Sequence, residues 1–183
     1  GSLGSVEGRA YAEGRPGGQA TPYASISVLL LPRSAAFEAE LEAIKTHSRD
    51  SPDAYIEAEP KVSAARLAFE RALIDTGADQ LILGSSTDGA GAFRFQRVPE
   101  GAWMLLAWRE TPQAKRPPPP KRSEAERYKS RPQVFGQTIV TLWWRPVTVR
   151  AGEEATVRLH DRNEWMTGVR EDRRVPGQGQ SAT

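Results

Sequence analysis

The sequence has 183 residues, which suits one domain or one domain with an insertion, and 38% of them are hydrophobic. It contains no cysteine, which excludes disulfides, thiolate metal sites and a cysteine nucleophile. The formal net charge is only +2, so we expect no nucleic-acid partner. No apolar stretch approaches the roughly 20 residues that a membrane-spanning helix needs.

The first part of the chain predicts two strands joined by a loop. Residues 1–5, with the sequence Gly-Ser-Leu-Gly-Ser, resemble a remnant of cloning, and we leave them out of a domain predicted to span residues 6–167. A strand is predicted at residues 6–11. The Gly- and Pro-rich stretch 14–22 reads as a loop, and residues 25–31 form a second strand that is apolar on both faces.

A helical period replaces the strand pattern over residues 34–76. Phe37, Leu41 and Ile44 recur at i, i+4 and i+7, which places them on one face of a helix. A second apolar stripe runs through residues 62–73 and ends before a glycine, and Pro60 suits the first turn of that helix. The sequence therefore predicts a helical hairpin inserted between the second and third strands.

Strand patterns return after this insertion. Asp88-Gly89 and Gly91 mark a tight turn that leads into a strand with Phe93 and Phe95 on its inward side. Further strands are predicted at residues 80–83, 103–108, 138–150 and 154–160.

Two segments break the strand pattern. Residues 112–135 contain four consecutive prolines, seven lysines and arginines and two glutamates, and we predict an extended basic loop. Residues 168–183 have no apolar period, and we predict a disordered tail.

The segment 87–101 carries the pattern T-D-x-x-G-x-F-x-F-x-x-V-P-x-G, in which turn glycines and core phenylalanines alternate. With the strands at 24–30 and 147–159, it resembles the carboxypeptidase regulatory-like family, which is related to transthyretin-like and CnaB-type sandwiches. Trp103 stands where that family often has tyrosine. The resemblance covers roughly half the chain. It implies a mainly β, seven-stranded Greek-key β-sandwich of the prealbumin/transthyretin type, here with a helical-hairpin insertion.

The residues give no pattern of a catalytic, cofactor or metal site. An intramolecular isopeptide bond needs a lysine on an early strand, and every lysine lies in the helices or the long loop. His47 and His160 are the only histidines, too few for a typical zinc site, and no Gly-x-Ser-x-Gly elbow is present. We therefore predict that the protein is not an enzyme and needs no cofactor.

Aromatic and basic side chains are the candidates for partner binding. Trp143 and Trp144 are adjacent in a strand, so they face opposite sides and one can be exposed. Met104, Leu106 and Trp108 form an apolar face that we expect the helical hairpin to cover. Long loops on rigid scaffolds often carry function. The candidate partner-binding residues are Trp108, Trp143, Trp144, Lys115, Arg116, Lys121, Arg122 and Tyr128.

These features predict a non-catalytic structural or protein-interaction module of the bacterial cell envelope or exterior. Its partner would be another envelope protein or a glycan. We expect it to be secreted, periplasmic or an outer-membrane lipoprotein whose leader is not in this sequence. The alternative is a carbohydrate- or anionic-surface-binding module, which an exposed row of tryptophans would support. An enzyme that gathers His47 or His160 with carboxylates is the third hypothesis.

Overall fold

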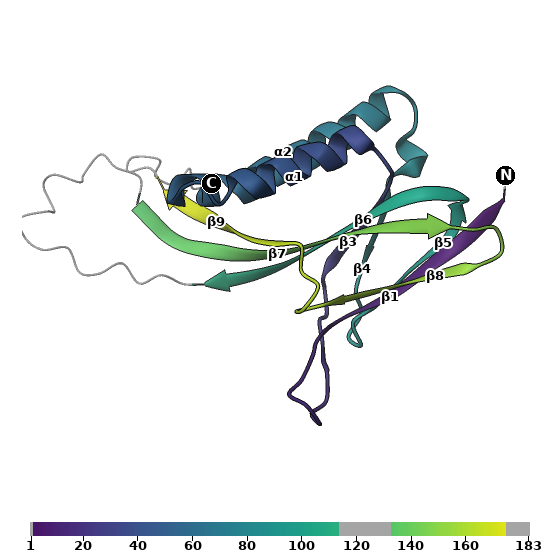
Figure 1. The fold of residues 1–183 in the computed structure, drawn as a ribbon, viewed down its shortest axis with the longest axis horizontal. Helices are drawn as coiled ribbons and strands as arrows, with labels where there is room; N and C mark the ends of the chain where they lie inside the picture. The colour runs from purple at the N-terminus through teal and green to yellow at the C-terminus, as the bar shows by residue number, and fades with distance from the viewer. Residues whose placement is uncertain (1, 114–132, 175–183) are drawn as a thin grey trace, which may run out of the picture.

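The computed structural model describes residues 2–113 and 133–174. In these residues the chain is mainly β, with two sheets and two α-helices. Figure 1 shows three layers, with both helices on one side of the sheets. None of the helices in the described ranges is long and apolar enough to cross a membrane.

The four-stranded sheet is built around the first strand, β1 (Leu3–Ala12). β5 (Ala92–Pro99) pairs antiparallel with β1, and β2 (Thr21–Pro22) pairs with its last two residues. β8 (Glu154–His160) pairs parallel with β1 on the other side, from Ser5↔Glu154 to Tyr11↔His160. The sheet thus joins segments from opposite ends of the chain.

The five-stranded sheet is antiparallel throughout and has the order β4-β3-β6-β7-β9. Its long central pair consists of β6 and β7, and β9 forms one edge. The strands are β3 (Ser27–Pro32), β4 (Leu83–Ser86), β6 (Gly101–Gln113), β7 (Gln133–Val149) and β9 (Met166–Arg174).

Two helices lie between β3 and β4, within the stretch that predicted a helical hairpin, and a short 3-10 turn follows them where the sequence predicted the start of a strand. They are α1 (Ala35–His47), α2 (Pro52–Asp75) and η1 (Asp79–Leu81). Ser34 and Ser51 cap the helices, because their hydroxyl oxygens accept the backbone N–H groups of Phe37 and Ala54. α2 continues through Pro60, and it is Pro52 that occupies the first turn.

The hydrophobic side chains form two cores, one on each side of the five-stranded sheet. The inter-sheet core contains Val6, Leu30, Phe93 and Trp143. The helix–sheet core lies under α1 and α2. It includes Met104 and Leu106, with Trp108 packed at its margin, so the helices cover the apolar strand face as the sequence predicted.

The structure corrects several boundaries. The described residues contain nine strands rather than seven. Leu3, Gly4 and Ser5 belong to β1 rather than to a remnant outside the fold, and a Cβ at Gly4 would overlap the backbone of Arg150. The Greek-key connections, the transthyretin-like assignment and the outer limits of the domain stay predictions.

Strands extend into both ends of one predicted irregular segment and into the start of another, because backbone pairing continues there. β6 runs to Gln113 and β7 begins at Gln133, so both ends of the predicted 112–135 loop are strand. Residues 168–174 of the predicted disordered tail lie in β9, where Val169 pairs with Ile139 and is buried. The remaining residues of both segments lie outside the described ranges.

Candidate functional site

The outward side of the four-stranded sheet, which we call the open face, is the surface that the two helices leave uncovered (Figure 1). Alternation along β1 decides which side chains reach it. Val6 and Ala10 are buried in the inter-sheet core, whereas Glu7, Arg9 and Tyr11 point outward. This face therefore carries charged and aromatic groups on a rigid backbone.

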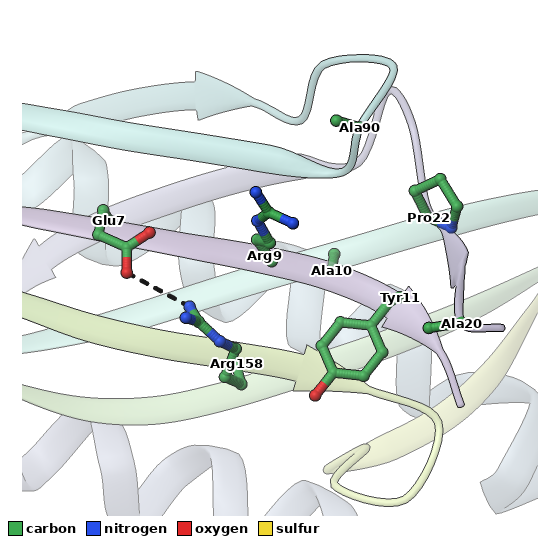
Figure 2. Close-up of a pocket in the computed structure, with 8 residues that line it drawn as sticks. All are labelled: Glu7, Arg9, Ala10, Tyr11, Ala20, Pro22, Ala90 and Arg158. Carbon is green, nitrogen blue, oxygen red and sulfur yellow. Dashed lines mark hydrogen bonds and ion pairs between the residues drawn. The ribbon is translucent and has the colours of Figure 1, made fainter. Parts of the chain in front are cut away.

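A pocket of about 620 Å³ lies on the open face (Figure 2). The turn before β5 forms one wall and is rigid, because the Asp88 carboxylate accepts the backbone N–H groups of Ala90 and Ala92, both at 2.9 Å. Gly91 has a φ of +74°, and a Cβ there would overlap the carbonyl of Ala10. The lining residues are Glu7, Arg9, Ala10, Tyr11, Ala20, Pro22, Ala90 and Arg158.

The charges in this pocket do not balance. Arg158 Nη1 lies 3.4 Å from Glu7 Oε1, which pairs one positive charge with the one carboxylate (Figure 2). The Arg9 side chain is exposed, and its guanidinium group has no hydrogen-bond or ion-pair partner among the described residues. The pocket thus holds an unpaired guanidinium group beside a satisfied ion pair.

Aromatic rings close one end of the pocket. Tyr11 stacks on His160 with ring centroids 5.5 Å apart and an interplanar angle of 30°. The Trp143 indole Nε1 donates to the His160 carbonyl at 2.9 Å, which anchors the end of β8 to the inter-sheet core. Stacking on His160, whose backbone is held by this hydrogen bond, therefore fixes the orientation of the Tyr11 ring.

Beyond this end lies a cluster of Glu13, His160 and Asp161. The pKa of the Asp161 carboxyl is lowered, first by the hydrogen bond that it accepts from the Glu13 backbone N–H, so Asp161 does not suit a general acid near neutral pH. His47, the other histidine, only pairs with Asp50 at the exposed end of α1. The cluster thus brings together an imidazole and two carboxylates, which are groups that can ligate a metal ion.

The structure separates the predicted partner-binding residues. Trp143 is fully buried in the inter-sheet core, so its indole has no surface for a partner. Trp108 and Trp144 are half-buried at the margin of the helix–sheet core, and the Arg66 guanidinium lies 4.6 Å from the Trp108 ring centroid. Their binding role stays a prediction. Lys115, Arg116, Lys121, Arg122 and Tyr128 lie outside the described residues.

No exposed row of tryptophans is present in the described part of the chain, where all five indoles are buried or half-buried. The aromatic platform that would have favoured a tryptophan-based sugar site is therefore missing from these residues. The open-face pocket was not predicted from the sequence. Its only sequence signal is the outward alternation of Glu7, Arg9 and Tyr11, which does not reveal that Arg158 is adjacent.

No protein-family model and no curated protein matches the sequence. Among solved structures, the chain is similar to a proposed carbohydrate-binding protein from Pseudomonas aeruginosa, at 16% identity and a TM-score of 0.48, over 87% of this chain and 88% of that one. It is also similar to the pilus backbone protein of Streptococcus pneumoniae, at 12% identity and a TM-score of 0.27. That match covers 57% of this chain and 30% of the pilus protein. Likenesses this distant assign neither a family nor a function, and the carboxypeptidase regulatory-like family stays a resemblance.

Proposed function

We propose that this protein is a non-catalytic binding module that holds an acidic glycan on its open face. The observation that carries the proposal is the unpaired, exposed Arg9 in a pocket of about 620 Å³. The proposal develops the alternative of a carbohydrate- or anionic-surface-binding module and moves the site from the tryptophans to β1 and β8.

The chemistry of the lining supports a sugar that carries a carboxylate. A guanidinium group binds a carboxylate through two parallel hydrogen bonds, which makes Arg9 the anchor for the anionic group. The Tyr11 ring offers an apolar surface beside it, and its hydroxyl can exchange hydrogen bonds with sugar hydroxyls. Glu7 is held by Arg158 and remains able to accept a hydrogen bond from a ligand hydroxyl.

The test is calorimetric titration with an oligouronate, which carries one carboxylate on each ring, and with a neutral oligosaccharide of equal length. We expect saturable binding of the oligouronate that weakens with added salt. Arg9→Ala should weaken binding about tenfold or more, equivalent to about 1.4 kcal/mol. Arg145→Ala removes another exposed arginine without a described partner, outside the pocket, and should leave binding unchanged.

Equal binding of the neutral and acidic chains, or equal losses in the two arginine variants, would contradict the proposal. Tyr11→Ala gives a second test, because loss of the ring should weaken binding to the oligouronate without changing its dependence on salt. If the Tyr11→Ala variant bound the oligouronate as tightly as the original protein, the proposed contact between the Tyr11 ring and a sugar ring would be contradicted.

A second candidate is the protein-interaction module of the cell envelope. Leu67 and Ile74 are 57% and 51% exposed on α2. Seven residues are about two helical turns, so both side chains lie on one side of the helix. A double Leu67→Lys and Ile74→Lys variant that loses an envelope partner retained by Arg9→Ala would favour this role. A secreted, periplasmic or lipoprotein location is part of both proposals, and cell fractionation tests it.

A further inference from the structure

We propose that Glu13, His160 and Asp161 form a binding site for a divalent transition-metal ion, of which Zn²⁺ fits the ligand set best. One ligand atom from each residue lies within 4.8 Å of the other two. The three residues meet where β1 and β8 end side by side. The inference does not rest on the proposed glycan site, because the ion alone is the ligand.

The distance between the first two ligands suits one ion. His160 Nδ1 lies 3.6 Å from Glu13 Oε1. Two ligands of a tetrahedral zinc ion, each with a bond of about 2.0–2.1 Å, are about 3.4 Å apart. Asp161 is exposed, and the carboxylate oxygen that does not accept the Glu13 N–H can complete a three-residue set, with water in the fourth position.

The donor types narrow the choice of ion. Imidazole nitrogen with two carboxylates suits Zn²⁺ and its transition-metal neighbours. Ca²⁺ and Mg²⁺ prefer sites made only of oxygen ligands, so they should bind more weakly here. Two carboxylates bring more negative charge than the nearby Arg162 cancels, which favours a divalent cation.

Hydrogen bonds donated by the backbone N–H groups of Glu13 and His160 hold the cluster in place. Asp161 Oδ1 accepts the Glu13 backbone N–H at 2.8 Å, which ties the end of β1 to the residue after β8. The Asn163 side chain accepts the His160 backbone N–H at 2.8 Å and donates to the Arg158 carbonyl at 2.7 Å. Because these contacts fix the backbone of the ligand residues, the conformational entropy lost when an ion binds should be small.

Arg162 contacts two of the three ligand residues in the metal-free protein. Its Nε donates to Glu13 Oε2 at 2.8 Å, and its backbone N–H donates to His160 Nδ1 at 3.2 Å. The Arg162 side chain is 68% exposed, so it can move into solvent at small cost. An ion must displace this guanidinium group from Glu13 and replace the Arg162 backbone N–H at His160 Nδ1. Removal of the side chain eliminates the competition at Glu13 and should therefore strengthen metal binding.

The experiment is calorimetric titration of the full chain with ZnCl₂, accompanied by the visible absorption spectrum of the Co²⁺ form. We expect one ion per chain and binding about tenfold or more weaker in His160→Gln and Glu13→Gln. His47→Gln removes the other histidine and should leave the affinity and the spectrum unchanged. Ca²⁺ should compete poorly with Zn²⁺.

Arg162→Ala supplies the opposite test, since it should bind Zn²⁺ several-fold more tightly than the original protein. This result cannot come from a misfolded variant. Binding no tighter than about 1 mM, or an equal loss in the His47 and His160 variants, would overturn the proposal. A weaker affinity in Arg162→Ala would overturn it as well.

Discussion

The Tyr23 side chain lies between the inter-sheet core and several charged side chains, which together shift its pKa. Its ring packs against this core and lies 6.2 Å from the Trp143 ring, and the Arg109 guanidinium sits 4.3 Å from its centroid. Burial raises the pKa of the Tyr23 phenol. Arg109 opposes this shift, and the carboxylates of Asp161 and Glu164 add to it. The folded protein therefore holds Tyr23 in its neutral form more strongly than the unfolded chain does.

This pKa shift predicts a loss of stability in alkali. Between the lower unfolded pKa, about 10, and the raised folded pKa, the folded state binds more protons, so stability falls as pH rises. The contribution of Tyr23 is complete below the unfolded pKa and is lost as pH passes the folded one. Tyr23→Phe removes this titration. Urea unfolding at several pH values should show a steeper alkaline decline in the original protein, and parallel declines would contradict the assignment.

The two adjacent tryptophans show what alternation along a strand can and cannot tell. It correctly placed Trp143 and Trp144 on opposite sides of β7. Alternation along β7 alone did not show that Trp144 packs against the core under α1 and α2, because these helices lie far from β7 in the chain. Trp144 is half-buried at the margin of that core.

At the scale of the elements, α2 and the sheet approach each other closely at Gly168 in β9. A Cβ at this position would lie 2.8 Å from the Cβ of Glu59. Glu59 is itself buried and paired with Arg170, whose Nη2 lies 2.7 Å from Glu59 Oε1. The glycine thus allows a helix carrying a buried carboxylate to reach its arginine on the edge strand.

Gly168→Ala should push α2 away from β9 and lower the free energy of unfolding by about 1–3 kcal/mol. Gly84→Ala is the matched control, because Gly84 also lies in a strand and its added methyl would meet nothing within 4 Å. We expect that control to change stability by no more than about 0.5 kcal/mol. Urea denaturation measures both variants, and equal effects would show that the contact with Glu59 does not limit the packing.

The types of the helices and strands could largely be predicted from local sequence patterns, whereas the residues at which they end could not. The stripe of Phe37 and Leu41 indicated α1, and the apolar runs indicated β3 and β6. β9 escaped prediction because its sequence is mostly polar, and its order comes from backbone pairing with β7. Pro60 suggested a helix start because proline favours the first turn, yet α2 passes through it.

At the scale of the whole molecule, both candidate sites depend on the pairing of β1 with β8. Glu13 and Asp161 are 148 residues apart in the chain and are joined by a hydrogen bond of 2.8 Å. The same pairing brings Arg158 beside Glu7. Neither site has a compact motif, so the sequence alone left His160 as an isolated histidine and Arg9 as an ordinary surface charge.

The parallel pairing of β1 and β8 also has a mechanical consequence. Tension applied between Leu3, at the start of β1, and the turn after His160, at the end of β8, pulls β1 from its first residue and β8 from its last residue. Because the strands are parallel, these forces slide one strand past the other and load the ladder from Ser5↔Glu154 to Tyr11↔His160 together. Single-molecule pulling between these two points should therefore require a higher rupture force than pulling across the antiparallel β6–β7 pair from one of its ends, which would open the bonds in succession.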